Sequence, residues 1–144
     1  MGLGHVPAGT FSRESPGAHI PRRERGEAGE DRAQALTDHR PRIGAAGEWI
    51  AAHWLTEQGL IIERRNVILD DGEIDLIVRD EDIRVAIEVR TITGSGDPID
   101  AVNRAKRRRV ASLARKLGVA RVDLVGVGLR DWGVEVHWVP GGTW

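Results

Sequence analysis

Two short apolar segments near the middle of the chain carry carboxylates at alternate positions. Residues 72–78 read GEIDLIV and residues 85–90 read VAIEVR, so Asp75 and Glu88 each interrupt a run of strand-forming residues. If the acidic stretch 80–82 closes an antiparallel hairpin, Asp75 and Glu88 face each other with their Cβ atoms roughly 5 Å apart. Facing carboxylates repel each other, and a divalent cation between them would relieve the repulsion. The spacing therefore predicts a metal site at Asp75 and Glu88.

The same hairpin register also has a purely structural interpretation. It sets Val78 opposite Val85, and it sets Glu73 opposite Arg90, where an ion pair could form. Acids on an exposed hairpin can also serve only to keep an edge strand soluble. The residues alone leave the metal site and the solvated hairpin open as alternatives.

Positive charge collects further along the chain. Residues 101–122 contain no acid. Five of their basic residues fall close together: Arg104, Lys106, Arg107, Arg108 and Arg109. A basic segment beside an acidic pocket predicts contacts with the phosphates of a nucleic acid. The alternative is a helix face that is merely solvated.

Composition narrows the class of protein. The chain has 144 residues, a formal net charge of −1 and no cysteine, which excludes disulfides and thiolate metal sites. It has no apolar run long enough to span a bilayer, and its first residues lack the basic-then-apolar order of a secretory signal. We therefore expect a single domain in the cytoplasm without membrane contact.

The folded part is expected to begin near residue 41. Residues 1–40 are rich in Gly, Pro, Arg and Glu without a sustained apolar period, which predicts a disordered N-terminal extension. Residues 41–144 are predicted to form an α/β domain in the order α-β-β-β-α-β-β. The predicted helices cover residues 43–58 and 98–117, the second capped by Asp97, and the predicted strands cover 60–67, 72–78, 85–90, 121–127 and 134–139.

Several motifs occur in a specific order along this domain. They are GAAGE at 44–48, Asn66, GEIDLI at 72–77, EVR at 88–90, Lys106 and RVDLV at 121–125. In this order and spacing the chain resembles the YraN family of small bacterial proteins, which is placed in the PD-(D/E)XK nuclease-like superfamily with Holliday-junction resolvases. The resemblance covers about residues 42–137.

The resemblance implies a restriction-endonuclease-like fold, with a central mixed five-stranded sheet flanked by helices. It implies metal-binding acids at Asp75 and Glu88, a helix-borne acid at Glu48, and Arg90 in the position where the superfamily usually has a lysine. The implied cofactor is Mg²⁺ or Mn²⁺, and the implied partner is a nucleic acid, expected to be DNA, bound by a homodimer as in resolvases. Glu48 also has a structural explanation, because an acid in the first turn of a helix favours the helix dipole.

Arg90 is the departure that matters for chemistry. Arginine can orient a phosphate, but unlike lysine it does not give up its proton to act as a base. Ile92 also stands where the family usually has a basic residue, and Lys106 could supply an ammonium group from the next helix. Three hypotheses stay open. They are a metal-dependent endonuclease with catalytic Glu48, Asp75, Glu88 and Arg90, a nucleic-acid-binding module that does not cleave, and a protein-interaction or self-association domain.

Overall fold

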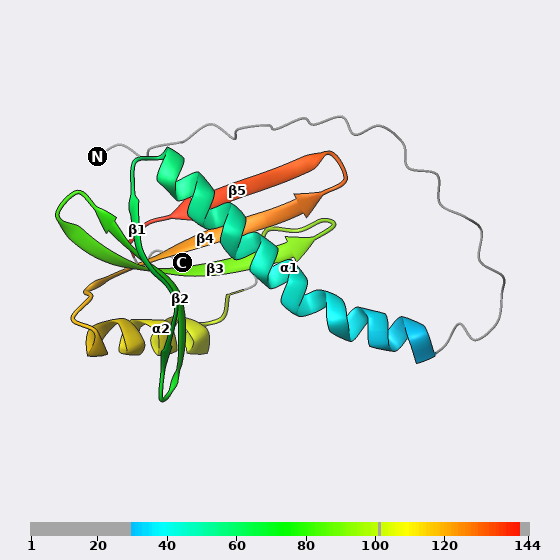
Figure 1. The fold of residues 1–144 in the computed structure, drawn as a ribbon, viewed down its shortest axis with the longest axis horizontal. Coiled ribbons are helices and arrows are strands. Elements are labelled where there is room, and N and C mark those ends of the chain that lie inside the picture. The colour runs from blue at the N-terminus through cyan, green and yellow to red at the C-terminus, as the bar shows by residue number, and fades with distance from the viewer. Residues whose placement is uncertain (1–29, 101, 142–144) are drawn as a thin grey trace.

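The computed structural model describes residues 30–100 and 102–141, which form two helices and five strands (Figure 1). In chain order these are α1 (Glu30–Glu57), β1 (Ile61–Leu69), β2 (Gly72–Asp80), β3 (Ile83–Thr93), α2 (Arg104–Lys116), β4 (Arg121–Arg130) and β5 (Gly133–Val139). The predicted order α-β-β-β-α-β-β is confirmed. Neither described helix is long and apolar enough to cross a membrane.

The strands form one mixed sheet in the order β1-β2-β3-β4-β5. Neighbouring strands are antiparallel except β3 and β4, which are parallel and joined through α2. The predicted facing of Val78 and Val85 is confirmed, because the two-residue turn at Glu81 and Asp82 fixes the register of the hairpin. The predicted α/β class with a central five-stranded mixed sheet is therefore confirmed.

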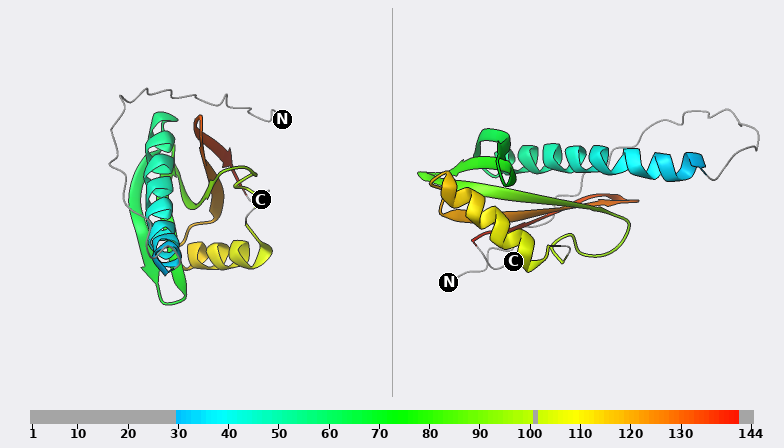
Figure 2. Two further views of the ribbon diagram at one scale, coloured as in Figure 1. Left: turned by 90° about the vertical axis from the view of Figure 1, so that its right-hand side faces the viewer. Right: turned by 90° about the horizontal axis from the view of Figure 1, so that it is seen from below.

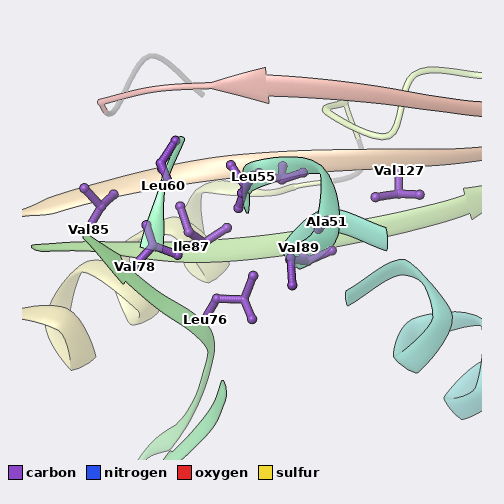
Figure 3. Packing of buried hydrophobic residues seen from close by; sticks show 11 residues of the cluster. Ala51, Leu55, Leu60, Leu76, Val78, Val85, Ile87, Val89 and Val127 are labelled. Carbon is purple, nitrogen blue, oxygen red and sulfur yellow. The ribbon is translucent and has the colours of Figure 1, made fainter. Parts of the chain in front are cut away.

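The two helices cover opposite faces of the sheet (Figure 2). Ala51 and Leu55 of α1 belong to one buried cluster together with Ile87 of β3 (Figure 3). Leu113 of α2 belongs to a second buried cluster together with Ala86. Because Ala86 and Ile87 are successive residues of a strand, their side chains point to opposite faces. β3 is thus the central strand that both helices bury.

The first helix begins earlier than the sequence predicts. α1 starts at Glu30, so residues 30–40, predicted to be disordered, are helical, and Pro41 lies inside the helix. The predicted start at Ile43 followed the apolar stripe, which does not extend to earlier residues, and proline, which lacks a backbone N–H, usually ends or kinks a helix. The rest of the predicted disordered extension lies outside the described residues.

The second helix begins later than predicted. The carboxylate of Asp97 accepts a hydrogen bond from the Ile99 N–H at 2.9 Å, which closes a turn instead of capping a helix. Asn103 is the actual N-cap, and its side-chain oxygen accepts a hydrogen bond from the Lys106 N–H at 2.9 Å. The predicted helix start at residue 98 is therefore wrong, and Lys106 lies in the first turn of α2.

Pairing between β2 and β3 ends before β2 reaches its first residue and before β3 reaches its last. Pairing of β2 with β3 ends at Leu76 and Ile87, while β2 stays paired with β1 up to its first residue. β3 continues beside β4 to Thr93. The β1–β2 arm consequently leaves the plane of the other strands and extends past α2 (Figure 1). The predicted facing of Glu73 and Arg90 is wrong for this reason, and no ion pair joins these two described residues.

Candidate metal centre

Asp75 lies where β2 parts from β3. Its Oδ2 accepts a hydrogen bond from the Val89 N–H at 2.7 Å, a donor that a continued β2–β3 ladder would have used. The predicted backbone pairing of Asp75 with Glu88 therefore does not form, since the ladder ends one residue earlier. The two side chains nevertheless come close enough to interact electrostatically. Asp75 thus both ends the hairpin and turns a carboxylate toward β3.

Glu88 is a buried acid in the middle of β3, with only 1% of its surface exposed. Its Oε1 lies 2.9 Å from the Lys106 ammonium, which reaches it from α2. Its other oxygen, Oε2, is the one buried side-chain polar atom without a hydrogen-bond partner among the side chains of residues 40–100 and 102–141. Buried polar atoms nearly always have a partner, so an orphaned carboxylate oxygen calls for an explanation.

Burial raises the pKa values of both acids. Burial and then the negative charge of Glu88 are the main causes that raise the pKa of Asp75 to about 7, and Glu48 adds to the rise. Burial also raises the pKa of Glu88, while the contact with Lys106 and the charge of Arg90 oppose this effect. Without a cation, the pair of carboxylates therefore favours holding a proton near neutral pH.

Glu48 approaches the pair from α1 and is held by Asn66. Its Oε2 accepts a hydrogen bond from the Asn66 side-chain amide at 2.9 Å. Asn66 lies in β1 between two residues that pair with the neighbours of Asp75 in β2. It has a φ of 47°, in the left-handed region that asparagine tolerates better than most residues. The sequence motifs include Asn66, but they predict no role for it. A lone asparagine inside a strand was the available signal.

The basic residues predicted to bind phosphates do not all lie at the acidic centre. Lys106 enters the centre, whereas three of the other predicted phosphate ligands form no ion pair with Asp75 or Glu88 among the described residues: Arg104, Arg108 and Arg109. Arg109 Nε donates a hydrogen bond to the Asp71 carbonyl oxygen at 2.8 Å, which fastens the β1–β2 arm to α2. Arg90 is half-buried on β3, two residues from Glu88 and hence on the same face of the strand.

The residues of the centre fit a small hard cation that keeps some of its water. The described residues contain no group of three or more His, Cys, Asp or Glu side chains suited to hold a metal, which excludes an all-protein cage within them. Mg²⁺ needs only one or two carboxylates, because waters complete its octahedral coordination. Asp75 and Glu88 would supply these two carboxylates, and the orphaned Oε2 of Glu88 would be a ligand.

Comparison with known proteins bears on this centre. The sequence profile described as "Uncharacterised protein family UPF0102" matches residues 47–127. The chain belongs to the UPF0102 family. This is the YraN family, so the resemblance noted from the sequence motifs is confirmed. The region matched by the UPF0102 profile contains Glu48, Asn66, Asp75, Glu88 and Lys106, which are all the residues that build the centre.

UPF0102 proteins of several bacteria are similar to this chain over most of their length. One from Leifsonia xyli subsp. xyli is 37% identical over 111 residues, which cover 69% of this chain and 93% of the relative. One from Symbiobacterium thermophilum is 45% identical over 103 residues, which cover 70% of this chain and 86% of the relative. A Nocardioides relative is 41% identical over 95 residues, covering 59% and 77% of the two chains.

The close approach of α1 to β3, which brings Glu48 to the centre, depends on Gly47. A Cβ atom at Gly47 would lie 2.8 Å from the Cβ of Thr91, whereas a Cβ at Gly44 of the same helix would meet nothing within 4 Å. We expect Gly47→Ala to lower the free energy of unfolding by about 1–3 kcal/mol, because the helix must move away from the strand. Gly44→Ala should instead raise it by about 0.5–1 kcal/mol through helix propensity. Urea unfolding of both variants would measure this, and effects of the same sign would contradict the packing argument.

Proposed function

We propose that this UPF0102 protein binds Mg²⁺ or Mn²⁺ between Asp75 and Glu88 and hydrolyses phosphodiester bonds in structured or branched DNA. One observation carries the proposal. Glu88 is buried with an unpartnered oxygen, beside a second partly buried carboxylate. Burying two acids side by side is costly unless a cation compensates them, so a purely structural role would favour apolar residues at these positions.

Each residue of the centre has a role in the proposed phosphodiester hydrolysis. A bound divalent cation would polarise the scissile phosphate and lower the pKa of a bound water. Asp75 and Glu88 would hold the cation, and Asn66 would keep the Glu48 carboxylate directed at the acidic side of the centre. Arg90 would orient a phosphate oxygen, because its guanidinium is a fixed fork of donors that stays charged.

DNA is the favoured substrate class because of the charge around the centre. Lys106 reaches Glu88 from the first turn of α2, and three further arginines lie within two residues of it on the same helix: Arg104, Arg107 and Arg108. These residues form a positive flank to an acidic centre, as a phosphate backbone requires. Charge of this kind reads the shape of the backbone and not the base sequence, which favours a structural substrate such as a branched duplex.

The test is a calorimetric titration of Mn²⁺, with cleavage of branched DNA assayed on the same samples. We expect saturable Mn²⁺ binding and metal-dependent cleavage by the natural protein, and the loss of both in an Asp75→Ala, Glu88→Ala double variant. Asp82→Ala removes an exposed acid from the turn of the same hairpin and is the matched control that should keep both. Retained cleavage in the double variant would overturn the proposed site.

A second candidate is a nucleic-acid-binding module that does not cleave. It is favoured by Arg90, which cannot act as a base, and by Lys106, which is engaged with Glu88. If this candidate is right, DNA binding should survive chelation of metals. The logarithm of the binding constant should then fall linearly with the logarithm of the salt concentration. An absence of DNA binding at low salt would instead favour a protein-interaction domain, for which the exposed Trp49 and Trp132 provide apolar surface.

A further inference from the structure

The ion pair between Lys106 and Glu88 joins two groups in very different surroundings. Nζ of Lys106 lies 2.9 Å from Oε1 of Glu88, and the exposed fractions of the two side chains are 39% and 1%. The carboxylate is therefore fixed inside the sheet, whereas the lysine reaches it from the solvent side of α2. No other described ion pair involves either acid of the centre.

We propose that Lys106 is an exchangeable counter-cation, which occupies Glu88 in the resting protein and is displaced when a divalent cation binds. This inference rests on the proposed metal centre and adds its regulation. An ammonium group and a metal ion both seek the same buried carboxylate. With both present, two positive ions would lie within a few ångströms of each other in a partly water-excluded site, where like charges repel strongly.

The surroundings of Lys106 allow the exchange without a change of fold. Its backbone N–H is held by the Asn103 cap at 2.9 Å, so the start of α2 stays fixed while the side chain moves. The half-exposed side chain has four flexible bonds and a solvated path away from Glu88. The orphaned Oε2 is an oxygen of Glu88 that the ammonium does not occupy.

The exchange would link metal occupancy to substrate contact. A displaced ammonium stays on the first turn of α2, where Arg109, three residues further on, shares its face of the helix. There it becomes available to a phosphate oxygen only after the metal has taken its place at Glu88. The resting centre would be neutralised by its own lysine, and the metal would activate the phosphate-binding side as well as the acidic side.

Calorimetric titration of Mn²⁺ into metal-free protein tests the exchange without DNA or turnover. We expect Lys106→Met to bind Mn²⁺ about tenfold more tightly than the natural protein, because the competing cation is gone. Arg115→Met removes the same charge from an exposed position on the last turn of α2 and should change the affinity less than twofold. Unchanged or weaker binding by Lys106→Met would overturn the exchange.

NMR of the lysine ammonium groups in the natural protein supplies a second test that needs no variant. The Lys106 signal should be protected from solvent exchange in metal-free protein and lose that protection as Mg²⁺ is added. Protection that persists at saturating Mg²⁺ overturns the exchange and leaves the metal site standing. Absence of Mn²⁺ binding in both the natural protein and Lys106→Met overturns the metal site and the exchange together.

Discussion

Replacing Asp123 with alanine is expected to lower the free energy of unfolding by about 3–5 kcal/mol. Asp123 is fully buried in β4 and receives four hydrogen bonds. Arg121 donates two of them, at 2.9 and 2.8 Å, the Trp138 indole donates one at 3.0 Å and the Gly141 N–H donates one at 2.8 Å. The substitution would leave the Trp138 and Gly141 donors without an acceptor and Arg121 with Asp80 alone, which lies 2.7 Å from its Nη1, and these losses cost far more than the pair contributes net.

Urea unfolding at neutral pH measures this cost, and Glu88→Gln is the informative comparison. Glu88 is equally buried, but one of its oxygens has no partner and the other acid of the centre repels it. A neutral amide could donate to the Asp75 carboxylate, so we expect Glu88→Gln to change stability by less than about 1 kcal/mol. Equal and large losses in both variants would mean that Glu88, like Asp123, is part of the structural framework.

The contrast between these two acids shows where sequence reasoning ends. Asp75, Glu88 and Asp123 each interrupt an apolar strand, and the pattern of residues around them is alike. What separates them is the partner that a distant segment supplies. Asp123 receives its donors from Trp138 and Gly141 at the end of the chain, whereas Glu88 receives a single ammonium from α2. Long-range contacts of this kind leave no local period in the sequence.

The parts that the sequence did predict are those set by local rules. The alternation of apolar residues and the short turn fix the hairpin register, and apolar periodicity fixes the order of helices and strands. The separation of β2 from β3 could not be predicted, because it results from the Asp75 side chain competing for the Val89 N–H. The direction of the Lys106 side chain could not be predicted either, because it depends on the N-cap at Asn103 and on the start of α2 at Arg104.

The metal-free protein is expected to lose stability as the pH rises from 5 to 8, and Asp75 is the main cause. Its pKa in the folded protein is raised to about 7 from 3.8, so between these values the folded state binds a proton that the unfolded state has released. Stability therefore falls as the pH rises through this range and stays level above it, by up to about 3 kcal/mol between pH 5 and pH 8. Thermal unfolding across the pH range would measure the fall, and Asp75→Asn should remove most of it.

Addition of Mg²⁺ or Mn²⁺ extends this prediction to the proposed centre. The cation competes with the shared proton, so it should stabilise the protein by about 2.7 kcal/mol at pH 8, at a concentration of one hundred times the Kd at that pH, and by less at pH 5. The same addition should leave Asp75→Asn nearly unchanged at both values, because the variant has lost a ligand and a negative charge. A pH-dependent fall in stability that divalent cations do not relieve would show that the two acids store a proton without binding a metal, and it would favour the module that binds DNA and does not cleave.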